Sequence, residues 1–190
     1  MWLAHHGVKG MHWGVRNGPP YPIQSVSYSQ KSAKTISNKM RSIKYDSSIH
    51  GLKSAEQVKK EGSGNCHDQV MLELKELRDA GYKPKAAFVM EYNPKTNQGG
   101  TTHSFVYYDD GNTTKWFENA WGGREGIHTF NSFKDIRKEI ESIHSNSNEF
   151  GDNKTYPKLA FGTFDDSKIK PGDTLQDIVD KSLRAGQPRG

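Results

Sequence analysis

The sequence predicts an α+β domain in which an amphipathic helix packs against an antiparallel sheet. Apolar side chains recur at helical spacing through residues 66–81, directly after a glycine-containing turn. Residues 86–92, 102–108 and 115–121 are rich in β-branched and aromatic residues, as strands are. The last two of these segments are joined by Asp109-Asp110-Gly111-Asn112, which is typical of a hairpin turn. A helix followed by hairpin-connected strands is the pattern of an α+β fold.

The same signals predict further elements on both sides of this region. Ser54 and Ser132 are suited to cap the helices that follow them. The expected elements are helices over residues 25–43, 54–60, 132–144 and 175–183, a strand over residues 159–164, and a loop over residues 93–100.

The chain is expected to divide into three parts. Residues 1–22 are dense in glycine and proline, which prevents a regular helix, yet they contain Trp2 and Trp13. We therefore expect an N-terminal segment that is more than a solvated linker. Residues 23–165 are predicted to form the main domain, and residues 166–190 a C-terminal helix and tail.

Composition and charge restrict the classes of function. The chain has 27 basic and 22 acidic residues, and its net charge is +5. The basic residues are scattered and form no nucleic-acid motif, so no specific nucleic-acid binding is expected. One cysteine excludes an intramolecular disulfide and a four-cysteine zinc site.

No apolar run approaches the ~20 residues of a membrane span. We also expect no signal peptide, because the first residues lack a basic region and an apolar core.

The single cysteine lies where a helix would activate it. Cys66 is predicted at the first turn of the helix over residues 66–81, where the helix dipole and unpaired N–H groups lower a thiol pKa. Its own N–H could donate to an oxyanion. We expect Gly64 and Asn65 to let a substrate approach the backbone there. His103, on a predicted strand, is the candidate base.

A third group is needed to hold the histidine in one orientation. The strand over residues 115–121 offers Glu118 and Asn119, and only one of them can face His103, because side chains alternate along a strand. Glu118 is favoured if Trp116 shares the catalytic face, and Asn119 otherwise. Trp116 and Trp121 are expected to form core and the wall of the substrate cleft.

Other histidines are interpreted as non-catalytic. His67 follows Cys66 directly, and neighbouring helical residues point about 100° apart, so we expect a surface or supporting role for it. His5, His6 and His12 are interpreted as part of a docking segment rather than a metal site. No metal and no cofactor are expected.

Two stretches resemble a known family. Gly64-Asn65-Cys66-His67-Asp68-Gln69, followed by a leucine-rich helix and Ala80-Gly81-Tyr82, resembles the nucleophile helix of the transglutaminase-like superfamily. Residues 102–107 resemble its histidine strand, and residues 116–121 resemble the strand of its acidic third member. The usual aspartate is absent, and Glu118 or Asn119 stands in its place.

This resemblance covers about residues 54–145. It implies a papain/transglutaminase-like fold, with N-terminal helices and the nucleophile at a helix N-terminus packed on an antiparallel sheet. It also implies a thiol-dependent amide hydrolase or acyl transferase of the cysteine protease, deamidase or transglutaminase type. The substrate would be a peptide or a glutamine side chain.

The first residues resemble a module of tailed-phage and prophage proteins of Gram-positive bacteria. The stretch that carries this resemblance is His5-His6-Gly7-Val8-Lys9-Gly10-Met11-His12-Trp13-Gly14-Val15-Arg16. It implies a phage or prophage origin, and a location in the bacterial cytoplasm or on the virion. Residues 1–22 would then bind a phage structural or host protein. The alternatives to an enzyme are a non-catalytic docking module that kept the fold and a host-directed effector.

Overall fold

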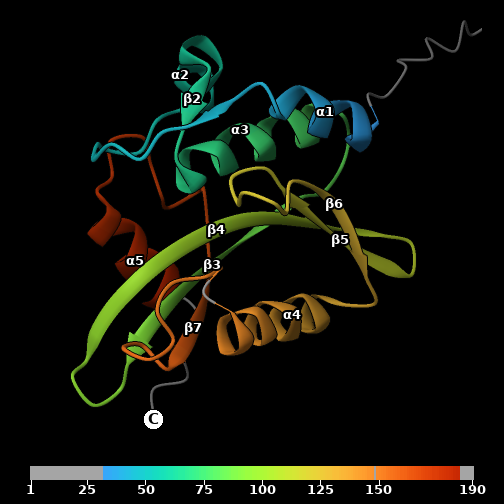
Figure 1. The fold of residues 1–190 in the computed structure, drawn as a ribbon. Helices are drawn as coiled ribbons and strands as arrows, with labels where there is room; N and C mark the ends of the chain where they lie inside the picture. The colour runs from blue at the N-terminus through green and yellow to red at the C-terminus, as the bar shows by residue number, and fades with distance from the viewer. Residues whose placement is uncertain (1–31, 148, 185–190) are drawn as a thin grey trace, which may run out of the picture. The chain divides into compact units, whose positions relative to one another are not determined.

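The computed structural model describes residues 32–147 and 149–184. Within these ranges, helices accompany a five-stranded antiparallel sheet and a short two-stranded parallel sheet (Figure 1). The predicted α+β class is therefore confirmed. The N-terminal segment 1–22 and the first part of the helix expected over residues 25–43 lie outside the described residues.

The five-stranded sheet is a meander with one added strand. Strands β3 to β6 pair in sequence order, and β7 returns to pair with the free edge of β3, so the order is β6-β5-β4-β3-β7. Every pair is antiparallel. The strands span Lys85–Asn93 (β3), Gln98–Asp110 (β4), Thr113–Glu118 (β5), Gly126–Phe130 (β6) and Lys158–Thr163 (β7).

The sheet differs from the prediction in three places. Residues 98–100, expected in a loop, begin β4, because a tight turn closes with an Asn97 N–H bond to Asn93 O of 2.8 Å. Strand β6 was not predicted, since its five residues have no clear apolar alternation. Strand β5 ends at Glu118 instead of residue 121, because the next three N–H groups turn toward the Glu118 carboxylate.

The helices begin where capping residues stand. The Ser54 side chain accepts from the Gln57 N–H, as expected of an N-cap, whereas Ser132 caps without such a bond. The helices span Ala33–Met40 (α1), Ala55–Glu61 (α2), Cys66–Asp79 (α3), Phe133–Asn146 (α4) and Leu175–Arg184 (α5).

Each face of the five-stranded sheet carries its own apolar core. Alternate residues of β3 point to opposite faces, so Phe88 packs with α1, α2 and α3, while Val89 packs with α4. Figure 1 shows α3 and α4 on opposite sides of the sheet. Trp116 and Ile140 are fully buried beside Val89. Burial of each such side chain stabilises the fold by about 1.5–3 kcal/mol.

Two segments that are distant from α3 in sequence, β1 and the residues just before α5, contribute to the structure around the start of α3. Lys44–Tyr45 (β1) pairs in parallel with Ser63–Gly64 (β2), which directly precedes α3. Leu52 accepts from the Gly172 N–H at 2.7 Å and donates to Asp173 O at 2.8 Å, just before α5. Ile178 of α5 is buried in the core on the α3 side of the sheet. The region predicted as a C-terminal helix and tail therefore contributes to the domain core.

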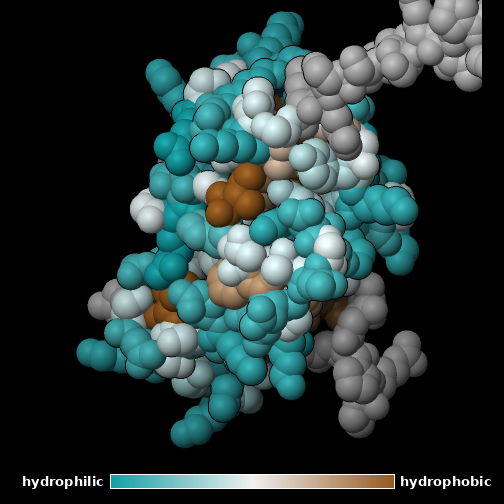
Figure 2. All heavy atoms as spheres, turned by 90° about the vertical axis from the view of Figure 1, so that its right-hand side faces the viewer, coloured by the Kyte–Doolittle hydropathy of each residue, from teal (hydrophilic) through white to brown (hydrophobic). Residues whose placement is uncertain are grey.

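The surface seen from the right-hand side of Figure 1 is mainly hydrophilic, with hydrophobic residues only in small patches (Figure 2). No helix in residues 32–147 and 149–184 combines the length and apolar composition needed to cross a bilayer.

Helix α5 is held close to β7 at a glycine, which gives a first prediction. A Cβ at Gly162 would lie 2.3 Å from the Ser182 carbonyl oxygen, and backbone cannot easily yield. We expect Gly162→Ala to lower the free energy of unfolding by about 1–3 kcal/mol, as measured by urea denaturation. The matched control is Gly122→Ala, because a Cβ there meets nothing within 4 Å. Equal stability of the two variants would contradict this close packing.

Candidate active site

Cys66 is the first residue of α3, and the segment before it is fixed by reciprocal caps. Asn65 Oδ1 accepts from the N–H groups of His67 and Asp68 at 2.9 and 3.1 Å. Asp68 Oδ2 in turn accepts from the Asn65 N–H at 2.9 Å. These caps use the second and third N–H groups of the helix and not that of Cys66. The sulfur therefore sits at the positive end of the helix dipole.

His67 fastens the start of α3 to strand β4. Its ring nitrogens lie 2.9 Å from Ser104 Oγ and 3.2 Å from Thr102 Oγ1. Those two hydroxyls flank His103 in sequence, so the residue next to the thiol binds the residues next to the candidate base. His67 is buried, which corrects the expectation of a surface position. The supporting role was the other expectation for His67, but its partners could not be read from the sequence, because they depend on β4 packing against α3.

The sheet register places His103 beside Glu118. Val106 of β4 pairs with Phe117 of β5. Continuation of this register sets Glu118 opposite Phe105, on the face of the sheet that also carries His103. His103 Nε2 and Glu118 Oε2 are 2.8 Å apart, and both side chains are buried. The His103 ring also interacts with the Cys66 thiol, and each of the two groups shifts the pKa of the other.

The carboxylate of Glu118 is surrounded by donors. In addition to His103, Oε2 accepts from Trp116 Nε1 at 3.2 Å. Oε1 accepts from the N–H groups of Asn119, Ala120 and Trp121 at 2.9, 2.8 and 2.9 Å. Burial raises the pKa of Glu118, but the positive His103 and these bonds outweigh burial and lower it. Glu118 is therefore ionised and fixed in place.

The pKa values of Cys66 and His103 shift in opposite directions. Burial raises the pKa of the Cys66 thiol, but the charges and hydrogen bonds of His67 and His103 outweigh burial and lower it to about 5. Burial lowers the pKa of His103, but the Glu118 carboxylate and the bonds to Cys66 and Glu118 raise it to about 10. Between these values the pair is a thiolate and an imidazolium, which is the reactive form of a cysteine nucleophile.

Tyr45, which the sequence did not point to, also reaches the thiol. Its hydroxyl interacts with the Cys66 thiol, and its side chain is half-exposed. Partial burial, then the charge of Cys66 and this interaction, raise the pKa of Tyr45 to about 12. Tyr45 arrives through the parallel pairing of β1 with β2, a contact that leaves no periodic signal in the sequence.

The other predicted site residues have different surroundings. Asn119 Nδ2 donates to Gln69 Oε1 at 2.6 Å and to Met40 O at 3.0 Å, so it joins α3 to α1 and does not bind His103. Trp116 is buried in the core. The Trp121 ring lies edge-on to the His103 ring, with the two ring centroids 5.3 Å apart. Gly64 is buried, and a Cβ there would lie 2.7 Å from Asp68 Cβ.

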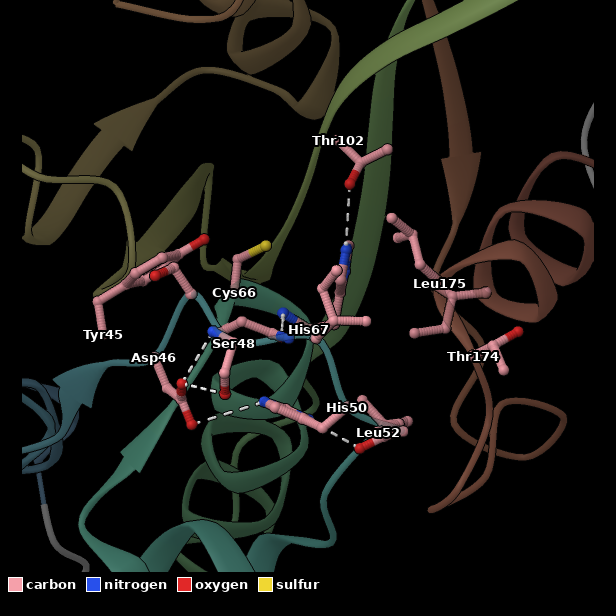
Figure 3. A pocket seen from close by; sticks show the side chains of 15 residues that line it. Tyr45, Asp46, Ser48, His50, Leu52, Cys66, His67, Thr102, Thr174 and Leu175 are labelled. Atoms are coloured by element: carbon pink, nitrogen blue, oxygen red, sulfur yellow. Dashed lines mark hydrogen bonds and ion pairs between the residues drawn. The ribbon is translucent and has the colours of Figure 1, made fainter.

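Cys66 opens onto a cavity of about 490 Å³ (Figure 3). Its walls are the segment 45–52, the residues Asn65–His67, Thr102 and the first turn of α5. A second cavity of about 650 Å³ is lined by Arg41, Asn119, Glu125 and their neighbours. Tyr45 belongs to both cavities and therefore separates them.

Glu73 is a second buried acid close to the site. It lies two helical turns after Cys66 on α3 (73 − 66 = 7 residues), so both point to the same side. Burial raises the pKa of Glu73 well above its usual value, and the negative charge of Glu118 raises it further. The two acids differ because donors surround Glu118. Glu73 is held neutral, and Glu118 keeps its charge.

No group of three or more His, Cys, Asp or Glu side chains in the described ranges is arranged to hold a metal ion.

One family match lies in the N-terminal segment. Residues 2–20 match a family described as a family of unknown function (DUF7211). These residues precede the described part of the chain and include none of the site residues. No curated protein matches the chain.

The neutral state of Glu73 predicts a pH dependence of stability. The unfolded chain releases this proton above about pH 4.3, whereas the folded chain retains it, because its pKa is raised. The contribution of Glu73 to the wild-type free energy of unfolding should therefore fall by up to about 1.4 kcal/mol per pH unit over this interval. Glu73→Gln carries no such proton, so its stability relative to wild type should increase from pH 4 to pH 7 in urea unfolding.

The control for this comparison is Glu56→Gln on α2. Glu56 is exposed, so its replacement should leave the pH dependence as it is in wild type. A stability difference between Glu73→Gln and wild type that is the same at pH 4 and pH 7 would show that folded Glu73 ionises normally.

Proposed function

We propose that this chain is a thiol-dependent amide hydrolase or acyl transferase with Cys66 as nucleophile, His103 as acid–base and Glu118 as orienting group. The observation that carries the proposal is the position of His103, whose Nε2 lies 2.8 Å from Glu118 Oε2 and whose ring also interacts with the Cys66 thiol. A nucleophile, a base and an orienter in such a chain are the general requirement for activated acyl transfer.

The proposed reaction begins with attack of the Cys66 thiolate on an amide carbonyl carbon. The carbonyl π electrons move to oxygen, and the Cys66 N–H and the Tyr45 hydroxyl donate to the resulting oxyanion. His103 then gives its proton to the amide nitrogen, the C–N bond breaks, and the amine leaves a thioester on Cys66. Water or an amine, deprotonated by His103, attacks the thioester carbon, and the C–S bond breaks. The acyl product leaves, and the Cys66 thiolate is restored beside the protonated His103. Water yields hydrolysis, and an amine yields acyl transfer.

The proposal includes a papain/transglutaminase-like arrangement. Three features support it: the nucleophile begins α3, the histidine lies on β4, and the acid ends the adjacent strand β5. Their order along the chain is the order that the sequence resemblance implies. Glu118 replaces the usual aspartate and reaches His103 with its longer side chain.

The test of this proposal is the pH dependence of Cys66 alkylation by iodoacetamide. In wild type, the rate should rise through about pH 5, the pKa of the thiol. His103→Ala removes one of the two imidazole rings that lower the thiol pKa, so the midpoint should rise from about 5 toward the ordinary value of about 8.5. At pH 6 the variant should react about 10- to 100-fold more slowly. The rate is measured by mass spectrometry of the single modified cysteine.

Two further variants make the alkylation result specific. Glu118→Gln keeps the shape but removes the charge that raises the His103 pKa, so its midpoint should lie between those of wild type and His103→Ala. His128→Ala is the matched histidine control, because His128 donates to Arg124 O at 2.7 Å, apart from the thiol. A wild-type midpoint near 8.5, unchanged in His103→Ala, would refute the proposed site.

We also propose that residues 1–22 attach the chain to a phage structural or host protein. The proposal is favoured by the resemblance of residues 5–16 to a phage and prophage module, and residues 2–20 match one family of unknown function as a unit. Cosedimentation with phage particles from the strain that encodes the chain tests this role. The full chain should sediment with the particles, whereas a chain that starts at residue 23 should not. Equal sedimentation of the two would contradict attachment through this segment.

A further inference from the structure

The cavity beside Cys66 gathers exposed apolar side chains from distant parts of the chain. In the described residues, the large apolar side chains that are exposed are Tyr45, Ile49 and Leu175, and all three line this cavity. Figure 3 shows Tyr45 and Leu175 on opposite sides, with Cys66 and His67 between them. Single exposed apolar residues are ordinary, but their convergence on one cavity is typical of a binding site.

Several polar side chains that line this cavity are hydrogen-bonded within the domain. Asp46 accepts from Ser48 Oγ at 2.6 Å and from Lys53 Nζ at 2.9 Å. Both ring nitrogens of His67 are engaged by hydroxyls of β4. His50 Nδ1 donates to Gly51 O at 2.9 Å. Its Nε2 makes no hydrogen bond but lies 3.6 and 3.4 Å from carboxylate oxygens of Asp46 and Asp68. A charged ligand would have to break these bonds, whereas an apolar ligand would leave them intact.

The second cavity offers a contrast. Arg41 and Glu125, which carry opposite charges, and the amide of Asn119 line it. Because Tyr45 is shared by the two cavities, a chain laid across Cys66 would meet apolar surface on one side and polar surface on the other. The apolar preference therefore belongs to the cavity that Cys66 itself lines.

We propose that the cavity beside Cys66 binds a bulky aliphatic or aromatic side chain of a peptide substrate, next to the amide that Cys66 attacks. This inference rests on the proposed function of Cys66. The cavity, at about 490 Å³, lies within the range of about 300–1,000 Å³ that is usual for ligand sites. It therefore has room for one large side chain and adjoining backbone. Glycine or aspartate at the same place gains little apolar burial.

The test uses chloroacetyl amino-acid amides as probes, which need no known substrate. The Cys66 thiolate attacks the CH₂ carbon, a C–S bond forms, the C–Cl bond breaks and chloride leaves. The amino-acid side chain is then held a few bonds from sulfur. Wild type should react about tenfold or more faster with the leucine and phenylalanine probes than with the glycine probe. The rates are divided by those of the same probes with free cysteine, which removes differences in intrinsic reactivity.

Variants of the cavity wall assign this preference to the cavity. Leu175→Asp and Ile49→Asp place a carboxylate among the apolar side chains and should reduce the leucine-to-glycine ratio toward one. Both positions are exposed, and Leu175 begins α5, where an acidic residue suits the helix dipole, so the variants should fold. Lys95→Asp, in the exposed β3–β4 turn, is the matched control and should keep the wild-type ratio.

The outcomes separate the two proposals. If iodoacetamide shows a reactive thiolate but the leucine and glycine probes react equally, the apolar specificity is refuted and the catalytic site stands. A leucine preference that survives both wall variants also refutes the assignment to this cavity. If iodoacetamide shows an ordinary thiol, the proposed function itself fails.

Discussion

Glu118 holds a negative charge in the interior of the domain, and the geometry of the candidate site follows from that charge. An isolated buried carboxylate is costly, and this one is stabilised by the His103 ring, an indole N–H and three backbone N–H groups. The same bonds stop β5 at Glu118 and turn the chain toward Trp121. Glu118 fixes the charge and the orientation of the His103 ring. The ionisation of the Cys66 thiol therefore also depends on Glu118.

A second set of contacts brings the thiol to that ring. His67 binds the hydroxyls on either side of His103, and the Asn65 caps fix the first turn of α3. The two systems meet at the contact between Cys66 and His103. The sheet therefore supplies the base and the orienter, and the helix supplies the nucleophile and its dipole. The apolar cavity forms where segment 45–52 and α5 extend past this junction.

The local parts of this arrangement could be predicted from the sequence. Turn residues and apolar periodicity placed Cys66 at a helix start and His103 on a strand, because both signals are contained in short stretches. The predicted strand offered Glu118 and Asn119 as the third group, and side-chain alternation allowed only one of them to face His103. Which of the two faces His103 depends on the register of β5 on β4. The positions of Tyr45 and α5 could not be predicted. They depend on β1–β2 pairing and on backbone bonds between residues far apart in sequence.

The most direct test of the central claim is to follow the protonation of Cys66 and His103 in the resting protein. The chain has one cysteine, so ¹³Cβ labelling of cysteine gives a single resonance whose shift reports thiol or thiolate. We expect this resonance to titrate at about pH 5, and the His103 ring to stay protonated until about pH 10. A thiol that titrates near 8.5 beside a His103 ring that titrates near its ordinary value of about 6.5 would contradict the ion pair.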